Sequence, residues 1–320
     1  ATCIEPNAEP VLSSCAHAEK QNSDYDQHPF HLFPQNYISL TDEHDILMMN
    51  KLIENCLFLK DKDRFNILRA KASDFRNTFI GETIVRDSIF DVIQNYVKSK
   101  EHEIKLLKFP IDDTELWAFT CLKDGIIFVT INTALPFNNQ IFAAAHELYH
   151  IYKYIEDSQE EYIEKGSILT RKDFDEEDVS EEDREANAFA ALILAPKEQI
   201  EKQIKITGRE FTDSDLYDLI HFMDYFAMPY KGMVLKLFEC GRYTEEQADI
   251  LLQSESRKTL EEAYIHDCGT RWLEPTFENN LASLKALVEL NLNSHNITDS
   301  RAKDDLAFLT DLEEKFKKQV

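Results

Sequence analysis

The chain has 320 residues, and 43% of them are hydrophobic, which is enough for buried cores and excludes a disordered protein. Its 60 acidic and 35 basic residues give a net charge of -25, which disfavours contact with nucleic acid backbones or anionic membranes and favours a neutral or basic partner. Six cysteines without a C-x-x-C pair, and no segment of roughly 20 apolar residues, lead us to expect a cytoplasmic protein with reduced thiols.

The N-terminal part of the sequence contains an irregular segment followed by helical patterns. Residues 1–36 hold four prolines among polar residues and show little periodicity, which predicts an irregular extension. Apolar residues then recur with a helical period from Thr41 to about Lys60 and from Asp87 to Ser99. We expect these two helices to serve packing.

Between about Glu103 and Thr133 the period of the apolar residues changes from 3.6 to 2. This change predicts strands over residues 104–109, 116–122 and 126–131. Lys123, Asp124 and Gly125 join the last two as a hairpin turn, in which glycine allows a positive φ. We therefore predict a small antiparallel sheet.

A stretch without glycine or proline then places His146, Glu147 and His150 in an H-E-x-x-H pattern. On a helix the two imidazoles lie on one face, close enough to share a cation, and Glu147 lies about 100° around the axis, within reach of a water on that cation. Small and apolar flanking residues indicate a buried helix, where such polar groups need partners. An amphipathic helix that carries two histidines by chance is the alternative. A sheet followed by this helix suits a zincin-type peptidase, although the sheet can also be a plain scaffold.

The segment from Glu156 to Asp183 carries 13 acidic residues. We expect most of it to be solvated, because runs of like charge seldom pack into a core. A lid over the cleft, or a selector for basic substrates, is the second interpretation.

The next helix is predicted over Glu181–Leu194, with Ser180 as its cap and an end at Ala195-Pro196. On it Glu185 shares one face with Phe189 and Leu192 and should point inward. An inward glutamate requires a partner. The partner is either an arginine in a salt bridge or a zinc ion, for which Glu185 would complete a His-His-Glu set.

The two motifs together resemble the ImmA/IrrE family of metallopeptidases. His146-Glu-Leu-Tyr-His150 is followed after 34 residues by Glu185-Ala-Asn-Ala-Phe-Ala-Ala-Leu-Ile-Leu-Ala-Pro196, and the second motif of that family runs E-A-N-x-F-A-x-x-L-L-x-P. The resemblance covers roughly residues 40–200. It implies a zinc-dependent peptidase encoded by bacteria and their mobile elements, some members of which cleave a repressor protein.

Carried over by motif position, the resemblance implies that His146, His150 and Glu185 bind the metal and that Glu147 is the general base and acid. The sequence departs from the family in two places. Tyr149 stands where glycine is common, and the acidic segment is longer than expected.

The C-terminal part is predicted to be helical. Three short helices, Asp213–Phe226, Tyr230–Glu239 and Thr244–Leu252, are similar to the helix-turn-helix-like segment that follows the peptidase core in some family members. Eight acidic and three basic residues between positions 213 and 250 disfavour DNA binding and favour packing or protein docking. Two further helices are predicted near residues 277–292 and 300–318.

These observations predict an α+β fold in three parts: an irregular extension (1–36), a zincin-like metallopeptidase domain with a small antiparallel sheet (37–200) and a helical C-terminal domain (201–320). The predicted function is a zinc-dependent endopeptidase that cleaves a protein substrate, a repressor-type regulator of a bacterial or mobile-element system. The alternative is a metal-containing protein-binding or regulatory module without turnover. Candidates for stabilising the oxyanion, by chemistry alone, are Tyr149, Tyr152 and His221.

Overall fold

A computed structural model of the protein describes residues 51–123, 125–157, 167–170, 179–207, 216–252 and 262–317. Contacts group Met49–Val320 into one unit, apart from Ala1–Met48. The predicted extension over residues 1–36 and the start of the helix predicted from Thr41 lie outside the described residues. None of the described helices combines the length and the apolar character that crossing a membrane requires.

The first described helices are α1 (Lys51–Asn55) and α2 (Leu57–Lys60), which break at Cys56 where one continuous helix was predicted. The helix predicted from Asp87 to Ser99 is confirmed as α4 (Ile89–Ser99), preceded by a 3-10 turn, η3 (Arg86–Ser88).

Helix α3 (Lys62–Phe79) was not predicted. Asp61 caps it by accepting a hydrogen bond from the backbone N–H of Arg64 at 2.9 Å. Its apolar stripe is narrow and lies among many charged residues, which hides its period in the sequence. The stripe is nevertheless buried and consists of Phe65, Leu68, Ala72 and Phe75.

The sheet has the strand order β1-β3-β2-β4, where β1 is Glu103–Phe109, β2 is Leu116–Lys123, β3 is Ile126–Asn132 and β4 is Ser167–Thr170. The three predicted strands are confirmed, and Gly125 has a φ of 77° in the turn between β2 and β3. The predicted antiparallel pairing holds for β2 with β3, but β1 runs parallel to β3. Strand β4, which was not predicted, pairs antiparallel with β2. The sheet is therefore mixed.

Strand β3 lies between β1 and β2 in the sheet. Asn132 at the end of β3 binds the segment of the chain that connects β1 to β2. The buried Asn132 amide donates to the carbonyls of Asp113 and Leu116 at 3.0 and 2.9 Å, and its Oδ1 accepts from the N–H of Ile111 at 2.9 Å. Strand β4 falls within the acidic segment that was predicted to be mostly solvated. Its Leu169 is fully buried, so at least this part of the segment belongs to the fold.

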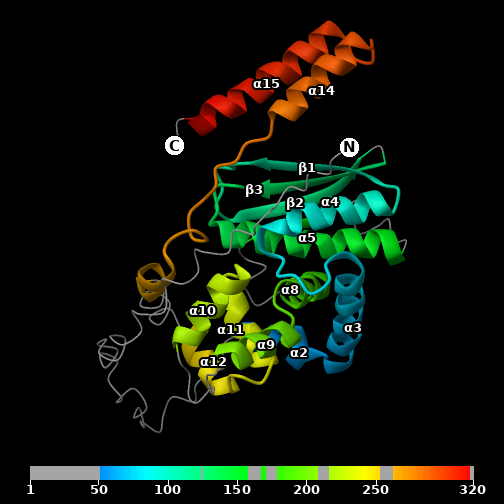
Figure 1. The fold of residues 1–320 in the computed structure, drawn as a ribbon. Helices are drawn as coiled ribbons and strands as arrows, with labels where there is room; N and C mark the ends of the chain where they lie inside the picture. Colours follow the sequence, from blue (N-terminus) through cyan, green and yellow to red (C-terminus); the bar gives the residue numbers. More distant parts are fainter. Residues whose placement is uncertain are drawn as a thin grey trace, which may run out of the picture. The chain divides into compact units, whose positions relative to one another are not determined.

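Helix α5 (Phe137–Asp157) packs against one face of the sheet, and α8 (Glu181–Leu194) packs against α5 (Figure 1). Both helices were predicted. An aromatic cluster joins them to α3 and α4: the ring of Phe75 lies 5.0 Å from that of Tyr96 and 6.1 Å from those of Tyr152 and Phe189. These contacts fix α5 and α8 side by side.

Four helices follow α8: α9 (Lys197–Thr207), α10 (Leu216–Phe226), α11 (Tyr230–Glu239) and α12 (Glu245–Leu252). The last three confirm the predicted helices, whereas α9 was not predicted. Helix α11 packs against both α12 and α8.

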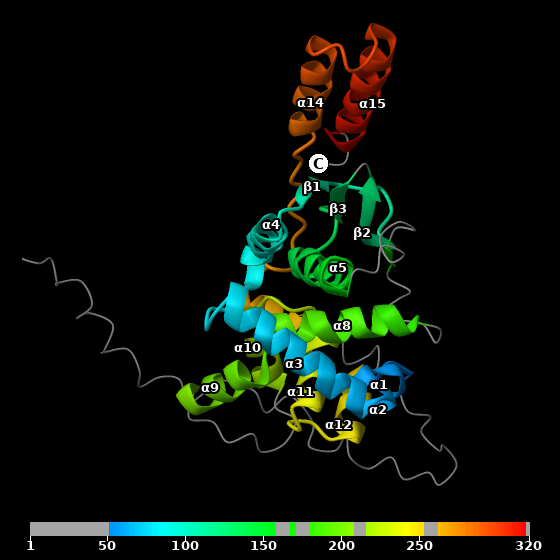
Figure 2. The ribbon, with the colours of Figure 1, turned by 90° about the vertical axis from the view of Figure 1, so that its right-hand side faces the viewer.

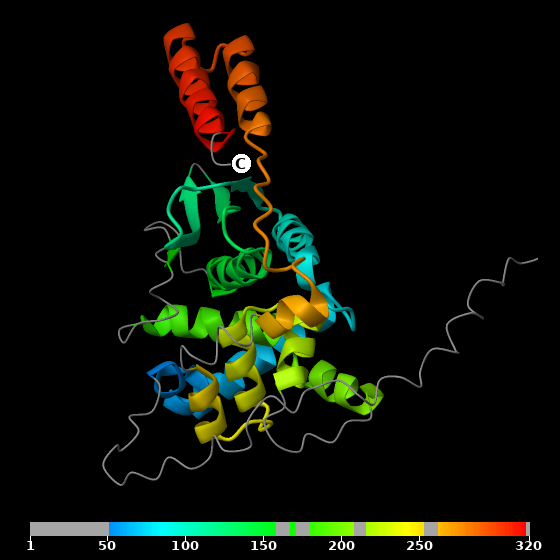
Figure 3. The same cartoon turned by 90° about the vertical axis from the view of Figure 1, so that its left-hand side faces the viewer.

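Helices α14 (Ala282–Asn293) and α15 (Asp299–Lys317) form a hairpin on the side of the sheet opposite α5 (Figures 2 and 3). Leu281 and Leu309 form its small core, against which Phe109 of β1 packs. Both helices were predicted, but α14 begins later than residue 277 because the chain before it is extended along the sheet. The boundaries predicted at residues 36 and 200 stay predictions.

Candidate metal centre

Helix α5 carries the H-E-x-x-H pattern at its buried centre. His146 and Glu147 are fully buried, and His150 is 1% exposed. Small side chains on the preceding turn, Ala143, Ala144 and Ala145, let the helix approach its neighbours closely and are themselves fully buried. The pattern thus lies inside the fold, as predicted.

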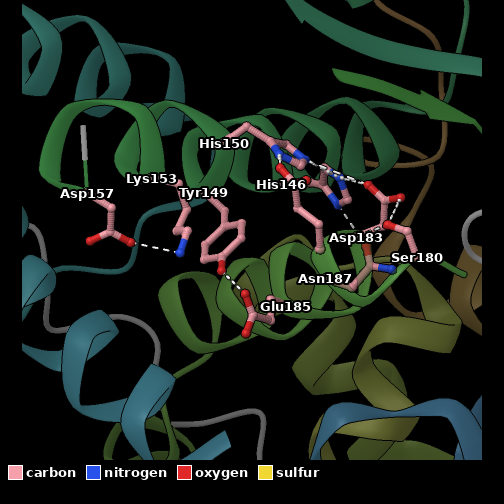
Figure 4. Close-up of polar contacts among 10 residues, drawn as sticks. His146, Tyr149, His150, Lys153, Asp157, Ser180, Asp183, Glu185 and Asn187 are labelled. Carbon is pink, nitrogen blue, oxygen red and sulfur yellow. Dashed lines mark hydrogen bonds and ion pairs between the residues drawn. The ribbon is translucent and has the colours of Figure 1, made fainter. Parts of the chain in front are cut away.

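The two imidazoles point toward each other, with 3.1 Å between their Nε2 atoms. Asp183 of α8 brings Oδ1 to 3.6 Å from Nε2 of His146 and 3.8 Å from Nε2 of His150 (Figure 4). Two nitrogens bound at ~2.0–2.1 Å to one tetrahedral zinc ion lie about 3.3 Å apart, and a carboxylate oxygen lies about as far from each. His146, His150 and Asp183 therefore have the spacing of three ligands around one ion, and they form the one such group among the described residues.

The other ring nitrogens set the tautomers of the two histidines. Nδ1 of His146 lies 2.8 Å from Oδ1 of Asn187, and Nδ1 of His150 lies 2.7 Å from a carboxylate oxygen of Glu182. Each Nδ1 must carry the proton to donate to these oxygens, so each neutral ring keeps a lone pair on Nε2. Two lone pairs 3.1 Å apart repel each other unless a proton on one Nε2 or a metal cation lies between them.

Negative charge surrounds this pair of lone pairs. Burial by itself would lower the pKa of His150, but the hydrogen bond to Glu182 and the nearby carboxylates raise it above its usual value. Burial likewise works to raise the pKa of Asp183, but contact with His146 and a 2.5 Å hydrogen bond from the Ser180 hydroxyl lower it. Asp183 is thus held as a carboxylate, and the site attracts a positive ion.

Glu147 has no such partners. The buried hydroxyl of Thr120 on β2 lies beside its carboxylate and works to lower its pKa, but no hydrogen bond of good geometry from a described residue reaches either carboxylate oxygen. Burial raises the pKa of Glu147. A fully buried carboxylate without a partner is costly in a plain structural helix, and a metal-bound water is the kind of group that would satisfy it.

Glu185 does not lie at the imidazoles in this structure, so its predicted place in the ligand set stays a prediction. Its carboxylate accepts hydrogen bonds from the Tyr149 hydroxyl and from Nε of Arg64 on α3, and Figure 4 shows Tyr149 and Glu185 facing each other away from the histidines. The alternative prediction, a salt bridge to an arginine, describes its position. Tyr149 stands where glycine was expected, and its ring brings a hydrogen-bond donor to Glu185.

Asp183 was not identified from the sequence because it was read as a solvated residue of the first turn of α8. Its backbone N–H does donate to the capping Ser180 hydroxyl at 3.0 Å. The signal that identifies it is Asn187, one helical turn further on, which binds His146. A residue on the same face as Asn187 necessarily faces α5.

The three candidates for an oxyanion donor have other described contacts. The Tyr149 hydroxyl is bound to Glu185, and Tyr152 packs 5.6 Å from the ring of Phe189. His221 stacks on Tyr225 at 6.1 Å between ring centroids.

Residues 99–237 match the family model of the IrrE N-terminal-like domain, Peptidase_M78. Over this part, the chain is similar to the ImmA/IrrE family. The match begins later and ends later than the predicted range of 40–200, and it includes α5, α8 and all three residues of the metal group. No curated protein matches the chain. The match to this peptidase family model supports a metallopeptidase-type function.

Proposed function

We propose that the protein is a zinc-dependent endopeptidase in which His146, His150 and Asp183 hold the metal and Glu147 is the general base and acid. The observation that carries the proposal is the pair of Nε2 atoms at 3.1 Å, each with its Nδ1 engaged elsewhere, on the same helix as the unpaired Glu147. Two nitrogens and one oxygen are the donor set of many catalytic zinc sites, which keep a further position for water.

When bound, zinc would lower the pKa of a water toward about 7 and polarise the scissile carbonyl. The residues of the chain supply the rest. Glu147 would accept the proton from the water as a carboxylate and pass it to the leaving amine, and burial, which raises the pKa of Glu147, strengthens it as the proton acceptor. Asn187 and Glu182 hold the two imidazoles in the orientation in which Nε2 faces the metal.

The substrate we propose is a protein, a repressor-type regulator encoded by the same bacterial or mobile-element system. The support is the match of residues 99–237 to the IrrE N-terminal-like domain and the acidic character of the chain, which favours a neutral or basic partner. A cytoplasmic location is part of the same proposal.

The test combines metal analysis with turnover. The purified full-length chain should contain about one zinc ion, by mass spectrometry of the metal, and wild type should cleave a protein encoded beside it. Glu147→Gln should retain the zinc and lose cleavage by about 10²–10⁴-fold, because it removes the group that moves the proton.

Two results would count against this function. Equal cleavage by wild type and by Glu147→Gln would show that another protease is responsible. A wild-type chain that retains zinc and binds its neighbour protein without cutting it would identify a binding module instead.

A further inference from the structure

The outer edge of β1 is only partly occupied. Asn280 lies beside it and makes strand-like hydrogen bonds: its backbone N–H donates to the carbonyl of Lys108 at 2.9 Å, and its side-chain amide donates to the carbonyl of Leu106 at 2.9 Å. Its Oδ1 accepts from the N–H of Lys108 at 2.8 Å. Asn280 thus forms hydrogen bonds with three outward-facing backbone groups of β1.

The alternating direction of backbone groups along β1 identifies the outward-facing groups that Asn280 does not bind. In a strand, every second residue directs both its N–H and its C=O to the same side. Because Leu106 and Lys108 face outward while β3 occupies the other side, the N–H of Leu106 and both backbone groups of Ile104 also face outward. No hydrogen bond from the described residues reaches these three groups. They are arranged as a neighbouring strand would require.

A groove of about 520 Å³ runs along this part of the edge (Figure 2 shows β1 between α4 and α14). Phe90 and Asp91 of α4 line one wall, and Leu284, Leu287 and Leu290 of α14 line the other. Leu290 is 60% exposed, so its apolar side chain is accessible from the groove.

We propose that this groove binds an extended peptide of a protein partner, which adds to the free edge of β1 and alternates apolar with basic side chains. Successive side chains of an added strand point to opposite walls, so apolar ones would meet the leucines of α14 and the intervening ones would meet Asp91. Asp91 has no ion pair with a described residue, whereas both lysines that line the groove are already paired, Lys105 with Glu103 and Lys108 with Glu278, each at 3.2 Å. The charge left over in the groove is therefore negative and complements a basic residue. This inference does not rest on the proposed peptidase activity.

The experiment measures fluorescence anisotropy of a labelled synthetic heptapeptide that alternates leucine and lysine, mixed with the full-length chain carrying Glu147→Gln so that no cleavage occurs. A peptide of the same composition with its leucines consecutive is the control for charge alone. We expect the alternating peptide to bind at least tenfold more tightly than this control. N-methylation of alternate residues should abolish binding in one register and spare it in the other, because only one set of N–H groups faces β1.

Leu290→Glu and Phe308→Glu form a matched pair, since the two side chains are 60% and 62% exposed and Phe308 lies on α15 outside the groove. Leu290→Glu should weaken the alternating peptide at least tenfold, and Phe308→Glu should leave it within twofold of the parent. Asp91→Lys should weaken the leucine–lysine peptide and strengthen a leucine–glutamate one.

The proposal is overturned if the parent chain does not bind the alternating peptide, or if both peptides bind equally well, which would show unspecific attraction to an acidic protein. Equal effects of N-methylation in both registers would also overturn it, because they would exclude pairing with β1.

Discussion

Substitutions of Asp183 and Glu185 should have different effects on zinc binding, although the two residues are two positions apart on α8. Asp183 lies 3.6 and 3.8 Å from the two imidazole nitrogens, whereas Glu185 is bound to Tyr149 and Arg64. Asp183→Asn replaces the only carboxylate among the three grouped ligands by a neutral amide, which is a poor zinc donor. We expect the zinc affinity to fall by more than the roughly 10–100-fold that changes outside the ligand shell cause. A loss of 100-fold corresponds to about 2.7 kcal/mol.

Glu185→Gln should behave differently. The variant removes a buried charge that accepts from the Tyr149 hydroxyl and from Arg64, so the free energy of unfolding should fall by about 1–3 kcal/mol. Its zinc affinity should stay within about tenfold of wild type, below the change that Asp183→Asn causes.

Competition with a chromogenic zinc chelator measures both affinities, and urea unfolding followed by circular dichroism measures both stabilities. The reasoning is refuted if Glu185→Gln loses zinc while Asp183→Asn keeps it. That outcome would return Glu185 to the role that motif position implies and would show that α8 turns about its axis when the metal binds.

Three other variants test the surroundings of the site. Glu182→Gln should weaken zinc binding by about 10–100-fold in the same competition assay, because it removes the charged acceptor of the His150 ring proton; unchanged affinity would exclude this role. Tyr149→Phe should lower the free energy of unfolding by about 1–3 kcal/mol in urea, because the buried Glu185 loses a donor; a variant as stable as wild type would contradict that contact. Phe189→Ala should cost about 3–5 kcal/mol in the same measurement, because its fully buried ring joins α8 to α3 and α5; a cost below about 1 kcal/mol would contradict this packing.

The features that were predictable depend on residues close together in the sequence. The period of apolar residues identified α5, α8 and three strands, and His146, Glu147 and His150 share one helix, so their relative placement follows from helical geometry alone. The parallel pairing of β1 with β3 was not predictable in this way, because it depends on the order of the strands in the sheet, in which β3 lies between β1 and β2. Strand β4 is four residues long inside an acidic segment, and its pairing with β2 again comes from distant residues.

The carboxylate that lies beside the two imidazoles could not be chosen from the sequence for a related reason. Asp183 and Glu185 lie about 200° apart around α8, and apolar residues flank both faces of this buried helix, including Ala186 and Ala190 as well as Phe189. Periodicity therefore shows that α8 is buried but does not show how it is rotated against α5.

Contacts among three residues on three helices account for the orientation of α8 about its own axis relative to α5. Tyr149 on α5, Glu185 on α8 and Arg64 on α3 share one hydrogen-bonded group, and Glu185 occupies its centre. Turning α8 to bring Glu185 to the imidazoles would break both of its hydrogen bonds and leave the largely buried Tyr149 hydroxyl without an acceptor, a cost of about 1–3 kcal/mol for each buried polar group. The departure from the expected glycine at position 149 and the placement of Asp183 beside the imidazoles therefore have the same physical cause.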